Sequence, residues 1–319
     1  MDRRQYLVCT GCLGVAVTAG CLGSGDDESD RTADDRTGER AIARSVGRLN
    51  RAALALNDSD GLDDTDEVSF DPTEPRDLID DARGFLETAE TESETDHESA
   101  VEELRAYADI LGKLTTVTET VADETIEDDA ETVTAVIETD GDLDDATRTI
   151  DDRNTSLAAA REDLDAAQAG LDSLDRDRLE ALSIVDLAEI DGGAERLDDV
   201  LASMITLGSG YETLLEGYEA LETAETQTDA ENHEVAADGF ATAGSRFEQS
   251  RTTFDDGIGD APSRLETRFE TARCQSDGLV TAAEHLEASA TAAAANDQTT
   301  ASSERSAGED ALDELGTCS

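Results

Sequence analysis

The chain has 319 residues, of which 79 are acidic and 24 are basic, so its formal net charge at pH 7 is −55. Phosphate binding requires clustered Lys and Arg, so this charge argues against nucleic acid as a partner. Acids are spread along the whole chain, and their repulsion opposes compaction until molar salt screens it. We therefore predict a halophilic surface. High charge is also typical of disordered chains. A disordered chain would show no periodic spacing of apolar residues, however, and this chain shows one.

The first residues have the three parts of an export signal. Arg3 and Arg4 precede a mostly apolar, uncharged run over residues 7–19, and Thr18-Ala19-Gly20-Cys21 closes it. A run of this length is too short to cross a hydrocarbon core, which needs roughly 20 helical residues. A positive start, a short apolar middle and small residues at the end predict a signal peptide over residues 1–20.

Residues 2–23 resemble the leader of the twin-arginine-exported lipoproteins of halophilic archaea. The resemblance implies that Arg3 and Arg4 form the export signal and that Cys21 is lipidated. It places the protein on the outer face of the cytoplasmic membrane, held there by its lipid anchor. The leader departs from the usual pattern at Asp2, Tyr6, Val8 and Thr18. An ordinary secretion leader and a retained anchor helix are the alternatives.

Residues 21–38 are rich in Gly, Ser and acids, which predicts a flexible tether. The next segment has apolar residues at three- and four-residue steps, as one face of a helix requires: Ile42, Val46, Leu49, Ala53 and Leu56. The same helix carries a basic stripe of Arg40, Arg44, Arg48 and Arg51. The stripe has two possible contacts, either anionic lipid headgroups or acidic helices of the same protein. We expect the second.

The segment from Asn57 to Pro75 is an acidic loop with a partial calcium-binding pattern. Asp58, Asp60 and Glu67 fall where a calcium loop has its third, fifth and twelfth positions, but Leu56 occupies the first ligand position. We therefore expect a solvated loop and no metal site.

Helical patterns continue through the middle of the chain. Helices are predicted from Pro75, and from His97 to at least Val121 with a break near residues 127–129. The clearest pattern follows, because five residues recur every seven positions: Leu143, Ile150, Leu157, Leu164 and Leu171. This heptad repeat predicts coiled-coil-like packing.

The C-terminal part of the chain is predicted to form helical hairpins. A short helix over residues 179–190 and Gly192-Gly193 precede a long seam over residues 194–218, which continues through Gly208–Gly210. Phe240, Phe247 and Phe254 form another heptad line, and further apolar faces follow over residues 265–290 and at Leu312 and Leu315. The hexapeptide at residues 86–91 recurs at residues 221–226, which fits repeated helical hairpins, with low-complexity use of Glu, Thr and Ala as the alternative.

These patterns predict an all-α fold, as an elongated bundle or an array of antiparallel helical hairpins with coiled-coil-like seams. We divide the chain into the signal peptide (1–20), a lipidated tether (21–38), an N-terminal helical region (39–190) and a C-terminal helical-hairpin region (191–319).

Two cysteines remain after Cys9 and Cys12 leave with the signal peptide and Cys21 takes the lipid. Cys274 and Cys318 are an even pair in an exported chain, which predicts a disulfide. Their midpoint is residue 296, and Asn296-Asp297 is a good turn. An antiparallel hairpin that reverses there would bring the two cysteines side by side.

No catalytic constellation is apparent. His97 and His233 are each followed by Glu, but a zinc-protease helix needs a second His four residues later, where Val101 and Ala237 stand. We expect a non-enzymatic envelope interaction or scaffold protein that binds a protein partner and needs no cofactor.

The alternative is a solute- or cation-binding lipoprotein that serves a membrane partner. A pocket lined by Tyr211 and Tyr218, closed by a hinge at Gly208–Gly210, would favour this alternative. A rod without a pocket, bearing an exposed apolar stripe, would favour the scaffold.

Overall fold

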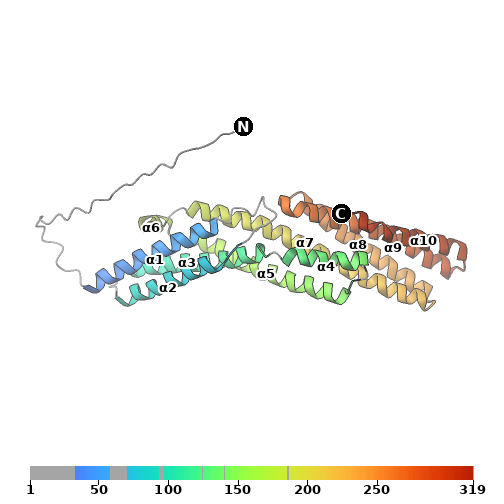
Figure 1. Ribbon diagram of the computed structural model, residues 1–319, viewed down its shortest axis with the longest axis horizontal. Coiled ribbons are helices and arrows are strands. Elements are labelled where there is room, and N and C mark those ends of the chain that lie inside the picture. The colour runs from blue at the N-terminus through green and yellow to red at the C-terminus, as the bar shows by residue number, and fades with distance from the viewer. Residues whose placement is uncertain are drawn as a thin grey trace, which may run out of the picture.

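The computed structural model describes residues 33–57, 70–92, 97–123, 125–139, 141–184 and 187–318, of which 91% are helical. No strand occurs in these residues, so the predicted all-α class is confirmed. The helices lie along a common direction in an elongated rod (Figure 1). They are α1 (Ala33–Asn57), α2 (Thr73–Glu92), α3 (Glu98–Val121), α4 (Thr125–Thr139), α5 (Leu143–Ser173), α6 (Arg176–Ala181), α7 (Leu187–Asp229), α8 (His233–Ile258), α9 (Ser263–Ala294), α10 (Gln298–Asp313) and the short 3-10 helix η3 (Leu315–Thr317).

The rod has two halves that share α7. In the first half, the α1–α2 hairpin packs with α3, α5 and the beginning of α7. In the second half, α7, α8, α9 and α10 follow one another as antiparallel hairpins (Figure 1). α7 has 43 residues and is therefore about 65 Å long. This one helix begins beside the last residue of α1, where Asn57 donates a hydrogen bond to Glu189, and continues to the end of the rod at which the α7–α8 and α9–α10 turns lie.

The predicted heptad line forms the buried face of α5. Ile150, Leu157, Leu164 and Leu171 are buried, whereas Leu143 at the first turn is half-buried. Three buried alanines lie on the same face, at Ala146, Ala160 and Ala167. Their small side chains let α5 approach α3 and α7 closely, as in the packing that a heptad repeat predicts.

Glycines of one helix receive aromatic rings of the next along α7, α8 and α9. A Cβ atom added at Gly210 would lie 2.2 Å from the Phe254 ring, and one added at Gly217 would lie 2.5 Å from the Phe247 ring. Phe254 and Phe247 also make edge-to-face contacts with tyrosines of α7. The predicted phenylalanine line of α8 is therefore core, and glycines on α7 make room for it.

Two hairpin turns have the same backbone conformation. Glu231 between α7 and α8 and Asn296 between α9 and α10 have φ values of 60° and 64°. In each turn the next residue donates its N–H five residues back, from Asn232 to Gln227 and from Asp297 to Ala292. This is the Schellman arrangement, which satisfies the last carbonyls of a helix. The predicted turn at Asn296-Asp297 is confirmed.

Several predicted boundaries are wrong. α1 already begins at Ala33, so residues 33–38 of the predicted tether are helical. α3 ends at Val121 and α4 begins at Thr125, so α4 already includes residues 127–129, where the break was predicted. The short helix predicted over 179–190 is in fact α6, over residues 176–181. α7 then begins at Leu187 and continues through Gly192-Gly193, so the boundary placed at 190/191 falls inside a helix.

Candidate functional site

Cys274 and Cys318 form the predicted disulfide. Cys274 lies in α9 and Cys318 directly follows η3, and their sulfur atoms are 2.08 Å apart with a Cα–Cα distance of 5.7 Å. Leu315 is buried beside the bridge, against Gly278, where an added Cβ would lie 2.5 Å from the leucine side chain. The bridge and this contact hold the C-terminal residues on α9.

The arginine stripe of α1 mostly faces its neighbour α2. Arg48 pairs with Asp81 at 3.3 Å, Arg51 pairs with Glu74 at 3.6 Å, and the Arg44 guanidinium lies 5.7 Å from the centre of the Phe85 ring. These contacts match the alternative in which the stripe serves acidic helices of the same protein. Arg40, nearer the start of α1, is exposed.

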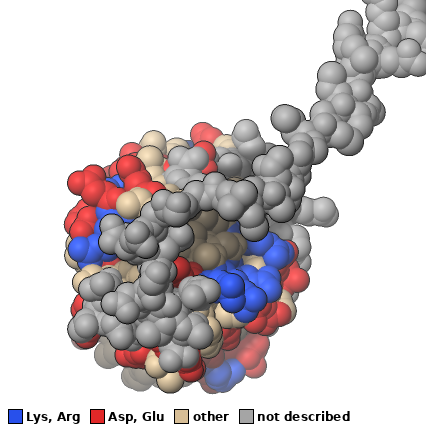
Figure 2. Space-filling view, turned by 90° about the vertical axis from the view of Figure 1, so that its left-hand side faces the viewer, with Lys and Arg blue, Asp and Glu red and all other residues tan. Residues whose placement is uncertain are grey.

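The end of the rod at which α1 begins carries basic side chains in small groups bordered by acids (Figure 2). Arg176 and Arg178 lie in α6 at this end, and each pairs with an aspartate, Arg176 with Asp191 and Arg178 with Asp175. The charges of these two arginines are therefore neutralised within the molecule.

Some predicted site residues lie outside the described part of the chain. These are the export arginines Arg3 and Arg4, the lipidation residue Cys21 and the acids of the calcium-like loop, Asp58, Asp60 and Glu67. Within the described residues, no three His, Cys, Asp or Glu side chains are grouped so that they could hold a metal ion.

The histidines do not form a site together. His97 precedes α3, whereas His233 begins α8 in the other half of the rod. The Nδ1 atom of His285 in α9 lies 2.8 Å from a carboxylate oxygen of Glu304 in α10. That contact joins two neighbouring helices near the α9–α10 turn.

Tyr211 and Tyr218, the expected lining of a solute pocket, belong to the protein core. Both rings are buried in the seam between α7 and α8, with ring centres 5.3 Å from Phe254 and 5.5 Å from Phe247, respectively. Burial raises the pKa of Tyr211 to about 12 and raises the pKa of Tyr218 further, so both hydroxyls stay neutral at physiological pH. α7 continues through Gly208–Gly210, and these glycines admit close neighbours instead of opening a pocket.

A cavity of about 240 Å³ lies elsewhere, between the ends of α7, α8, α9 and α10. Its apolar wall is formed by Phe240, Leu286, Ala290 and Leu312. Its polar wall is formed by Glu225, Thr228, Asp229, Ser289, Arg305 and Glu309. Sequence reasoning missed this cavity because its residues come from four helices. The available signal was the alanine-rich end of α9, whose small side chains leave space.

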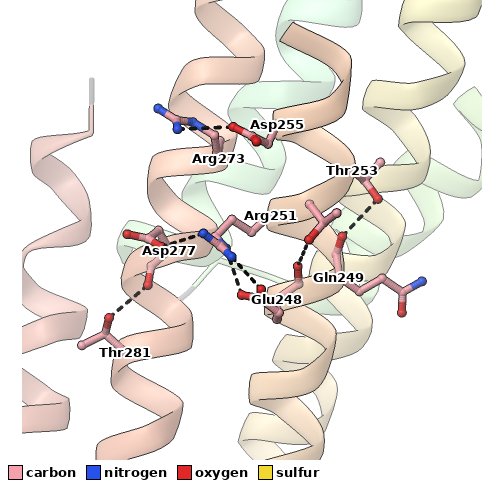
Figure 3. A network of polar contacts seen from close by, with 9 residues as sticks. Glu248, Gln249, Arg251, Thr253, Asp255, Arg273, Asp277 and Thr281 are labelled. Atoms are coloured by element: carbon pink, nitrogen blue, oxygen red, sulfur yellow. Dashed lines mark hydrogen bonds and ion pairs between the residues drawn. The ribbon is translucent and has the colours of Figure 1, made fainter.

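Ion pairs between helices organise the acidic surface. Arg251 of α8 pairs with Glu248 one turn away and with Asp277 of α9, while Arg273 of α9 pairs with Asp255 of α8 (Figure 3). The hydrogen bond from Arg251 lowers the pKa of Glu248 below its usual value. Arg251 thus pairs with two carboxylates, which fits a chain with about three times as many acids as bases.

Comparisons with known proteins identify no relative of this chain. No protein-family model, curated protein or solved structure matches it. None of the described helices combines the length and the apolar composition that crossing a membrane would require.

Proposed function

We propose that this protein is a lipid-anchored envelope interaction protein, non-enzymatic, that presents one end of its rod to a protein partner outside the cell. The leader and Cys21 support the location. The observation that carries the role is the arrangement of the two ends. α1 begins at one end of the rod, and the α7–α8 and α9–α10 turns lie at the other (Figure 1).

The lipid anchor would then lie close to the end of the rod at which α1 begins. Eleven residues lie between Cys21 and Ala33 in the chain, so a fully extended chain spans at most about 40 Å from one to the other. The end formed by α7–α10 would face away from the membrane. Within the described residues, Leu54 and Val235 are the large apolar side chains that are exposed, so the sides of the rod carry little apolar surface for a partner.

A second candidate function is a solute-binding lipoprotein that serves a membrane partner. The cavity between α7, α8, α9 and α10 favours it, because this cavity lies at the end of the rod that would face outward. The location proposal is common to both candidates.

The location is tested by changing the leader. Cys21→Ser should release the protein into the medium or leave it unprocessed, because no thiol remains to take the lipid. Arg3→Lys with Arg4→Lys should block export. Cell fractionation with immunoblotting measures both outcomes. Undiminished membrane retention of the Cys21→Ser protein would overturn the anchor.

The orientation is tested on the same cells. An epitope inserted at the turn formed by residues 230–232 should bind antibody on intact cells, since this turn would point away from the membrane. The control is the same epitope inserted between α5 and α6, near the anchored end, where antibody should bind less. Equal binding at both places would contradict the orientation.

A further inference from the structure

Small residues lie in and beside the cavity between α7, α8, α9 and α10. Gly308 of α10 brings its backbone against Leu286 of α9, where an added Cβ would lie 3.0 Å from the leucine side chain. Ala290 lies one turn further along α9 and leaves space in front of Phe240. Ser289 is buried, but its hydroxyl donates a hydrogen bond to the Ala301 carbonyl at 2.8 Å. The apolar wall is therefore fixed on both sides by tight helix contacts.

Arg305 is unusual among the cations of this protein. Nearly every other Lys or Arg of the described residues has an ion pair, a hydrogen bond or a ring contact, as a net charge of −55 would favour. Arg305 has none with other described residues, although Glu309 follows one turn later and Asp229 lines the same cavity. Arg305, Asp229 and Glu309 are exposed and line the polar side of this open cavity without an ion pair between them.

We propose that this cavity binds a small zwitterion with an apolar side chain, namely an apolar α-amino acid. The side chain would occupy the space beside Phe240, Leu286 and Leu312. The carboxylate would pair with the Arg305 guanidinium, whose fork of N–H donors suits a carboxylate. The ammonium group would pair with Asp229 or Glu309. The proposal deepens the solute-binding candidate and rests on it, but it does not depend on the membrane location.

Size and charge select this class. A cavity of about 240 Å³ is smaller than the roughly 300–1,000 Å³ of sites for drug-sized ligands, so it suits a molecule of amino-acid size. A simple anion would meet the carboxylates of Glu225, Asp229 and Glu309. A simple metal cation would meet Arg305 and an apolar wall, and among the described residues no three acids are grouped so that they could hold it.

Isothermal titration calorimetry on the purified, disulfide-bonded protein at molar KCl tests the proposal. L-leucine should bind saturably. Leucinamide lacks the carboxylate, 4-methylpentanoate lacks the ammonium group and glycine lacks the side chain. Each should bind at least about tenfold more weakly, because each leaves one group of the cavity unpaired or unfilled. Absence of saturable binding of leucine and phenylalanine, or equal binding of leucine and leucinamide, would overturn the proposal.

A matched pair of variants locates the site. Arg305→Gln should weaken leucine binding about tenfold or more, whereas Arg246→Gln should leave it unchanged. Arg246 is also an exposed arginine of this half of the rod, but it pairs with Glu216 on the surface and does not line the cavity. Circular dichroism verifies that both variants are folded. Wild-type affinity in Arg305→Gln would overturn the site, while the location proposal would stand or fall by cell fractionation alone.

Discussion

Gly210 and Gly217 of α7 lie one heptad apart, and each receives one phenylalanine ring of α8. The rings of Phe254 and Phe247 also lie one heptad apart on the antiparallel helix. Glycine therefore has a packing role at these two positions, since any side chain would occupy the volume that the ring fills. The two glycines set how closely α7 and α8 approach.

We predict that Gly210→Ala destabilises the protein by about 1–3 kcal/mol, because the added methyl group would overlap the Phe254 ring and force both helices to shift. The free energy of unfolding is measured by urea denaturation at molar KCl, followed by circular dichroism. The control is Gly84→Ala on the exposed face of α2, where nothing lies within 4 Å of an added Cβ. Alanine should stabilise α2 there by about 0.5–1 kcal/mol. The same effect in both variants would contradict the packing role of Gly210.

The sequence alone could show part of this arrangement. The spacing of Tyr211, Leu215 and Tyr218 predicts one apolar face, and this face is buried in the structure. It could not show which glycine faces a ring, because the ring comes from a different helix. Gly208–Gly210 therefore suggested a hinge beside a pocket, whereas the structure places close contacts there. The sequence could not predict the cavity between α7, α8, α9 and α10 for the same reason, since each of these four helices contributes a few residues to it.

The α9–α10 hairpin is the element whose geometry follows most directly from the sequence. A turn at Asn296 and equal rises along two antiparallel helices place Cys274 opposite Cys318, and the structure has this pairing. The weaker predictions were at helix ends. α6 and the start of α7 were misplaced because Gly192 and Gly193 were read as helix breakers, yet both lie inside α7. Tertiary contacts of a long helix can override the low helix propensity of glycine.

We predict that Cys274→Ser with Cys318→Ser lowers the free energy of unfolding by about 4 kcal/mol, the chain-entropy value for a closed loop of 44 residues. The bridge restricts the unfolded chain, so its loss favours unfolding. Urea denaturation at molar KCl measures the change. Reductant should lower the urea midpoint of the wild-type protein and leave that of the double variant unchanged. Equal midpoints for the oxidised wild-type protein and the double variant would show that the bridge contributes nothing to stability.

The acidic surface governs the behaviour of the whole molecule. Removal of residues 1–20, which carry one acid and two arginines, would leave a net charge of −56. This net value already counts the arginines that pair with acids of neighbouring helices, such as Arg251 and Arg273. The excess of acids causes mutual repulsion along a thin rod, which salt screens over about 3 Å at 1 M and over about 10 Å at 0.1 M.

We predict that the helical circular dichroism signal is strong at molar KCl and largely lost after dialysis into dilute buffer, because unscreened repulsion between the acids then opposes the compact state. A salt titration followed at 222 nm gives the midpoint. The disulfide-bonded and reduced proteins should both show the transition. A cooperative thermal melt with full helical signal at about 50 mM salt, where the Debye length exceeds 10 Å, would contradict this view of the surface.

α7 has a mechanical consequence for the rod. It runs unbroken from Leu187 to Asp229 and is packed against α5 in one half and against α8 in the other. The two halves therefore cannot swivel about a loop at residues 190–191. If the end formed by α7–α10 is to change its orientation, α7 must bend, and its backbone hydrogen bonds oppose this bending. The cavity at that end thus keeps a nearly constant orientation relative to the start of α1.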